Sequence, residues 1–148
     1  MMLHTMKNHA FAGLLMVGLL ISSASAEDWP QWRGPHFNGS SQATGLPEKL
    51  DQSNQAWVSH LPGTGSGTPI VWQDRIFISC LDQESKKLQA VCVSRKDGAI
   101  LWMKQAGLGF LSNNRNDTAS PSAVTDGKLV WFYFGTGDLL ACDLDGNV

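Results

Sequence analysis

The sequence lacks a membrane-spanning apolar run. Phe11 to Ile21 is apolar, but this run is about half of the ~20 residues that a spanning helix needs. Lys7 precedes it, and the small residues Ala24-Ser25-Ala26 follow it, as in a secretory signal peptide. We therefore predict a signal peptide over residues 1–26, cleaved after Ala26. The mature chain is expected to be exported, periplasmic or extracellular, and without a transmembrane anchor.

A marked excess of charge is also missing. Residues 27–148 carry all 13 acidic residues and 10 of the 11 basic ones, so their net charge is about −3 with histidine neutral. Nucleic-acid binding usually selects a basic face. We therefore expect no nucleic-acid partner.

The motifs of common catalytic and metal sites are absent. The sequence has no C-x-x-C and no G-x-S-x-G, and His36 and His60 lie far apart, so we predict neither catalytic residues nor metal ligands. Cys80, Cys92 and Cys142 are odd in number, which in an exported chain leaves a free thiol or an intermolecular pair. We favour buried apolar strand positions for them, and their pairing stays open.

A 3.6-residue period of useful length is absent from residue 56 onward, which argues against helices. Short runs rich in β-branched and aromatic residues alternate with turns instead. They predict strands at residues 57–61, 68–72, 75–81, 88–94, 99–104, 120–125, 128–134 and 139–143.

Residues 27–55 predict an irregular N-terminal arm and connector. Prolines and a glycine interrupt residues 28–35, and residues 36–55 are polar. We expect the arm to pack on the first strands, because Trp29 and Trp32 each carry a large apolar area.

Residues 56–148 contain an internal repeat. Pro69 matches Pro121 at a spacing of 52 residues, and Asp97-Gly98 matches Asp145-Gly146 at a spacing of 48. A period near 50 residues with four strands per copy is typical of a β-propeller blade. We predict an all-β partial propeller of about two four-stranded antiparallel blades, residues 99–104 opening the second. A sandwich of unrelated hairpins is the alternative.

A blade buries its two apolar faces only by stacking on neighbouring blades, and a propeller has about 4–8 of them. The sequence holds about two. We expect either a fragment of a longer protein, which we favour, or a chain that assembles with other copies.

Residues 92–102 resemble the tryptophan-docking motif of pyrroloquinoline-quinone (PQQ)-type propellers, Ala-x-Asp-x-x-x-Gly-x-x-x-Trp. Gly98 and Trp102 match it, whereas Cys92 and Ser94 replace its Ala and Asp. Residues 141–148 resemble it with a turn one residue shorter.

The arm at residues 29–35 and the run at residues 118–122 are similar to exported PQQ-like repeat proteins of planctomycete-type bacteria. This resemblance implies a propeller of about seven or eight blades. It also implies that indole rings lie on turn glycines and fasten neighbouring blades. The structural docking residues are then Trp57, Gly98, Trp102 and Gly146.

The polar loop at residues 111–118 is the candidate ligand site. Arg115 offers a planar donor fork, and Asn114, Asn116 and Asp117 add polar groups. A solvated loop whose Asn and Asp residues cap their own turns is the alternative.

Two functions follow from the resemblance. The first is a non-catalytic binding or scaffolding module in the cell envelope, with an envelope protein or a glycan as ligand and no required cofactor. The second is the N-terminal part of a periplasmic quinone-dependent alcohol or sugar dehydrogenase, in which PQQ and calcium bind the full-length protein. Fold alone does not decide between them.

Overall fold

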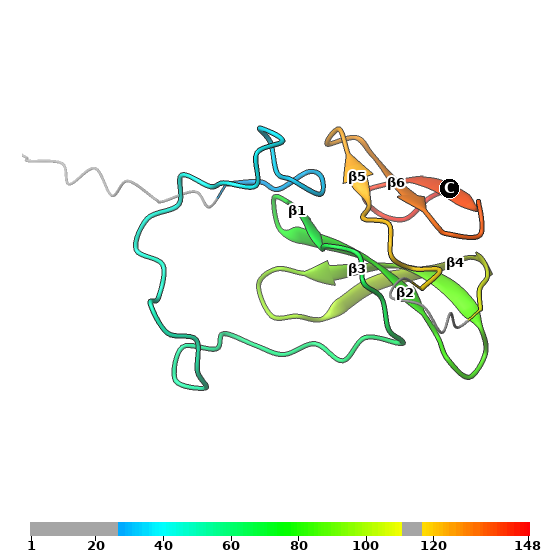
Figure 1. Ribbon diagram of the computed structural model, residues 1–148, viewed down its shortest axis with the longest axis horizontal. Helices are drawn as coiled ribbons and strands as arrows, with labels where there is room; N and C mark the ends of the chain where they lie inside the picture. Colours follow the sequence, from blue (N-terminus) through cyan, green and yellow to red (C-terminus); the bar gives the residue numbers. More distant parts are fainter. Residues whose placement is uncertain (1–26, 111–116) are drawn as a thin grey trace, which may run out of the picture.

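A computed structural model describes residues 27–110 and 117–148 (Figure 1). The described residues form seven strands and no helix, which confirms the all-β prediction. In this part of the chain, no helix has the length and apolarity needed to cross a membrane. The predicted signal peptide lies outside the described residues. The strands are β1 (Ile70–Trp72), β2 (Arg75–Leu81), β3 (Lys87–Ser94), β4 (Ile100–Leu108), β5 (Val124–Thr125), β6 (Leu129–Tyr133) and β7 (Leu139–Asp143).

Strands β1 to β4 form the first sheet, which is antiparallel and keeps the sequence order β1-β2-β3-β4. Tight turns make consecutive strands neighbours, since a hairpin needs few connecting residues. Gln73 turns the chain between β1 and β2 at a φ of 51°, and Gly98 lies between β3 and β4 at a φ of 75°. Alternate side chains point to opposite faces, so Phe77 and its cross-strand partner Cys92 share one face.

The structure corrects the predicted grouping of strands. Residues 99–104 were expected to open the second unit, whereas β4 pairs with β3 and completes the first sheet. The cause is the short turn at Asp97-Gly98, which returns the chain directly beside β3. The longer connection after β4 therefore joins two sheets rather than two strands of one sheet.

Strands β5, β6 and β7 form the second sheet, also antiparallel, with three strands where four were predicted. Its first strand is shorter than the predicted residues 120–125. Pro121 has no N–H to donate to a ladder. Just before it, the N–H of Ala119 donates to Asp117 Oδ1 (2.9 Å), so a turn replaces the start of the predicted strand.

The two sheets pack face to face around one apolar core. The rings of Phe77 (β2) and Phe132 (β6) have centroids 6.4 Å apart, and Trp102 (β4) lies 5.9 Å and 6.1 Å from them. Burying one such side chain contributes about 1.5–3 kcal/mol. Cys92 and Cys142 lie in this core, and Cys80 lies on the other face of the first sheet. All three are buried, as predicted, and all three are free, which the sequence had left open.

The N-terminal arm lies beside the first strand of each sheet (Figure 1). Trp29 exchanges backbone hydrogen bonds with Val71 of β1 (2.8 and 2.9 Å), and the N–H of Thr125 of β5 donates to Pro30 O (3.0 Å). The connector at residues 40–55 then swings away from both sheets.

Trp32 corrects the expectation for the arm. Its side chain is 66% exposed, whereas Trp29 is half-buried. Only Trp29 takes part in the bridge to β1. The chain turns directly after it, since the N–H of Gly34 donates to Gln31 O (2.9 Å), and this turn leaves Trp32 away from the strands.

Candidate functional site

The indole of Trp57 lies on the turn between β3 and β4. Its Nε1–H donates to Arg95 O (2.9 Å). A Cβ built on Gly98 would come within 2.5 Å of the ring, and the φ of this residue is +75°. Glycine is therefore the residue that allows both the backbone conformation and the ring position.

The indole of Trp102 makes the same contact between the two sheets. From β4 its Nε1–H donates to Leu144 O (2.9 Å) in the turn after β7. Its ring lies 2.9 Å from the position that a Cβ on Gly146 would take, and Gly146 has a φ of +84°. The four residues named from the sequence thus form two pairs, Trp57 with Gly98 and Trp102 with Gly146.

Two similar contacts were missed by the sequence analysis. The ring of Trp72 in β1 covers Gly127 in the turn between β5 and β6, and the ring of Trp29 covers Gly34 in the arm. The turn at Gly127 is visible in the sequence from its Asp-Gly pair. The contact of this turn with Trp72 is not visible in the sequence, because β1 and the turn become neighbours only when the two sheets pack.

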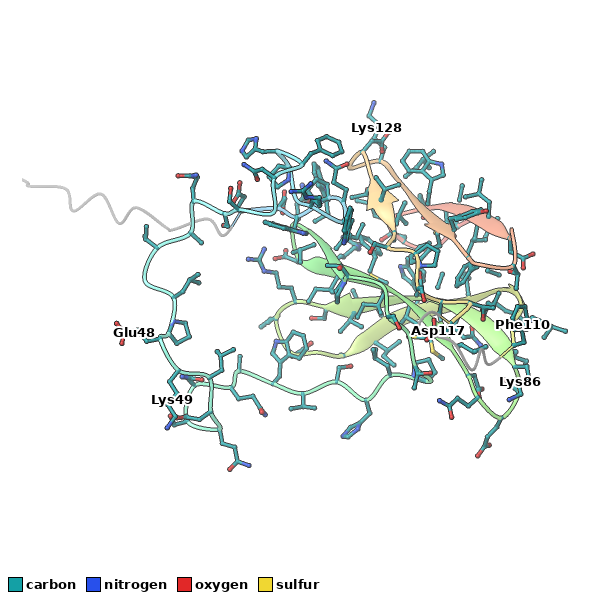
Figure 2. The ribbon with its side chains drawn as sticks, in the orientation of Figure 1. Glu48, Lys49, Lys86, Phe110, Asp117 and Lys128 are labelled. Carbon is teal, nitrogen blue, oxygen red and sulfur yellow. The ribbon has the colours of Figure 1, made fainter. Side chains whose placement is uncertain are left out.

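The turns separate into two ends of the molecule. At one end, the rings of Trp57, Trp72 and Trp102 each lie on the glycine of an Asp-Gly turn. The opposite end, which we call the loop end, comprises residues 62–69, 82–86, 109–110, 117–123 and 134–138. Hydrogen bonds join its parts, since the N–H of Gly109 donates to Lys86 O (2.7 Å) and the N–H of Gly135 to Thr118 O (2.8 Å). Figure 2 shows Lys86 and Phe110 close together, away from Lys128 in the turn between β5 and β6.

The predicted ligand residues fall partly outside the described chain. Asn114, Arg115 and Asn116 lie there. Asp117 is described and half-buried at the loop end. Its Oδ1 accepts hydrogen bonds from the N–H of Ala119 (2.9 Å) and from Ser120 Oγ (3.2 Å). Its carboxylate thus caps its own turn, as in the alternative interpretation of this loop.

An open depression of about 570 Å³ lies at the loop end. Two loops form it, residues 61–64 and the turn 82–84 between β2 and β3. Gln83 Nε2 donates to Thr64 Oγ1 (3.1 Å) and ties the loops together. The depression combines an amide, a hydroxyl and carboxylates with the apolar Leu61 and Pro62. Residues 61–64 and 82–84 match no binding motif in the sequence, so this depression could not be predicted from it.

Several carboxylates stabilise turns. Hydrogen bonds from the Ser85 hydroxyl and from the backbone N–H groups of Ser85 and Glu84 hold the pKa of Asp82 below its ordinary value. The side chain and backbone N–H of Asn147 likewise lower the pKa of Asp143. These groups stay ionised at neutral pH and hold local backbone, which is a structural role and not one in proton transfer.

The described residues do not by themselves assign a cofactor. Among residues 27–110 and 117–148, no three His, Cys, Asp or Glu side chains converge as metal ligands. No family model, curated protein or solved structure matches the chain. The geometry of the loop end and of the indole–glycine contacts is therefore what points to a function.

The thiols are buried and poorly ionised. Burial, together with the nearby Asp117, raises the pKa of Cys80 to about 11. Burial, with a smaller opposing effect of Arg75, raises the pKa of Cys92 to about 12. Burial also raises the pKa of Cys142. A thiol reacts as its thiolate, so none of the three is set up as a nucleophile at neutral pH.

We expect the native protein to resist Ellman's reagent at pH 8, because its thiols are both buried and protonated. Labelling should reach three thiols per chain only after denaturation. The increase in absorbance at 412 nm measures it. Rapid labelling of any thiol while the circular dichroism of the sheets is unchanged would contradict the expectation.

Proposed function

We propose that the chain forms two blades of an exported β-propeller, which serves as a non-catalytic binding or scaffolding module in the cell envelope. One observation carries the proposal. The Trp57–Gly98 and Trp102–Gly146 contacts are equivalent, with an indole N–H to turn carbonyl distance of 2.9 Å in both. A propeller repeats the packing of one sheet on the next around its axis, so equivalent contacts are expected at successive joints. The same joint underlies the resemblance to PQQ-like repeats.

The loop end is the proposed binding surface. The packed sheets form a rigid base, and loops on a rigid base commonly carry binding groups. The depression there offers the Gln83 amide, the Thr64 hydroxyl and the exposed Glu84 carboxylate beside apolar side chains. Amides, hydroxyls and carboxylates suit the hydroxyls of a glycan or the backbone of an envelope protein.

Binding to purified peptidoglycan and to a purified envelope protein fraction tests this surface by biolayer interferometry. We expect Gln83→Ala to weaken binding about fivefold to tenfold, as for one lost hydrogen bond of about 1–1.4 kcal/mol. Lys128→Ala, in the turn between β5 and β6, is the matched control and should leave binding unchanged. The proposal would be refuted if the protein bound neither material, or if both variants lost the same amount of binding affinity.

A dehydrogenase assay addresses the alternative function. PQQ and calcium are added to the purified protein, and the reduction of a dye is followed with an alcohol or glucose. In the described residues the turn-capping carboxylates do not converge as a calcium site, so no catalytic step is assigned to them. A flat response supports the binding role. Substrate-dependent reduction would favour the dehydrogenase.

A further inference from the structure

Residues 57–61 occupy the position of an outer strand. β4 is the outer strand of the first sheet, and its Trp102 docks on the second sheet. Trp57 docks on the first sheet through the same ring contact and the same 2.9 Å hydrogen bond. Residues 57–61 therefore dock on the first sheet in the same way as β4 docks on the second sheet.

The side chains of residues 57–61 support the equivalence. Trp57, Ser59 and Leu61 are half-buried, whereas Val58 and His60 are exposed. β4 has the same alternation, since Trp102, Lys104 and Ala106 are half-buried and the residues between them are exposed. This period of two belongs to an extended strand with one covered face.

Residues 57–61 nevertheless belong to no sheet. Within the described chain, no backbone hydrogen bond joins them to other residues. An extended segment with open N–H and C=O groups is a template for strand pairing. Trp57, Leu61, Ile76 and Ile78 also line an apolar depression of about 260 Å³ beside it.

The second sheet offers the matching half. In the first sheet β3 lies between β2 and β4, whereas no described residue pairs with the outer edge of β7. Its outer face is apolar and open, with Leu129, Tyr133 and Leu139 each at least 40% exposed. On the corresponding face of the first sheet, Phe77 is fully buried against the second sheet.

We infer that the chain associates head to tail with further copies of itself. Residues 57–61 of one copy pair with β7 of the next as its fourth strand, and the outer face of that second sheet covers the face of the first sheet that carries Ile76 and Ile78. The joint continues the interface already present between the two sheets.

Sedimentation velocity of the purified chain tests this inference. We expect the mass to rise above that of one chain between about 5 and 200 µM, by mass action. Val58→Pro removes a backbone donor and should abolish the rise, while Val58→Thr keeps the donor and the rise. Leu139→Lys places a charge on the outer face and should also abolish it, whereas Leu50→Lys in the connector should not.

Hydrogen exchange of the amides in residues 57–61 supplies a second readout. Their exchange should slow as the concentration rises, and only in proteins that associate. A chain that stays monomeric over the whole range overturns the inference. So does association that survives both Val58→Pro and Leu139→Lys. None of these readouts depends on a ligand, so they fail separately from the proposed binding function.

Discussion

Phe132→Ala is expected to lower the free energy of unfolding by about 3–5 kcal/mol, the usual loss for a large buried aromatic residue. Phe132 is fully buried and lies within 6.4 Å of Phe77 and 6.1 Å of Trp102 between ring centroids. The substitution leaves a cavity between the two sheets. Strand pairing holds each sheet in place, so the surrounding residues cannot move in to fill the cavity. Urea unfolding followed by circular dichroism measures the loss.

Tyr133→Ala is the matched control for this prediction. It removes an aromatic ring from the next residue of β6, whose side chain points to the opposite face and is 52% exposed. Its cost should stay within about 0.5–1 kcal/mol, as for other surface positions. Equal losses in the two variants would mean that the sheets do not pack through the face that carries Phe132.

The strands that the sequence predicted best are those whose neighbours are local. β2 and β7 begin and end at the predicted residues, because alternation and nearby turns define both ends. Residues 57–61 show the same alternation, yet they form no strand in the described structure. A strand requires a partner edge as well as a pattern, and no described segment supplies one.

The candidate site was less predictable than the fold. The turns at Gly98 and Gly146 were visible from their Asp-Gly pairs, but Trp72 gives no local sign of its contact with Gly127. The depression near Gln83 and Thr64 arises where two loops meet, and no spacing between these residues announces it. Such contacts depend on how the sheets pack, which a residue pattern of period two does not encode.

Gly146→Ala should have the second large effect on stability. The backbone there has a φ of +84°, which costs an L-residue about 1–2 kcal/mol. The new methyl group would also displace the Trp102 ring and weaken its hydrogen bond to Leu144 O, for a total of about 2–4 kcal/mol. Gly137→Ala isolates the backbone part, because Gly137 has a φ of +94° and no atom within 4 Å of its Cβ position.

A double-mutant cycle decides whether the ring is the cause. In a Trp102→Ala background, Gly146→Ala should cost only what Gly137→Ala costs, about 1–2 kcal/mol, because the methyl group no longer meets the indole. Urea unfolding in a stabilising sulfate buffer keeps all four proteins of the cycle folded at the start of the titration. If Gly146→Ala costs the same with and without Trp102, the contact does not fasten the first sheet to the second. The Trp102–Gly146 contact would then not stabilise the packing of the two sheets. The similar contact of Trp57 would give no physical reason for further sheets to stack in the same way.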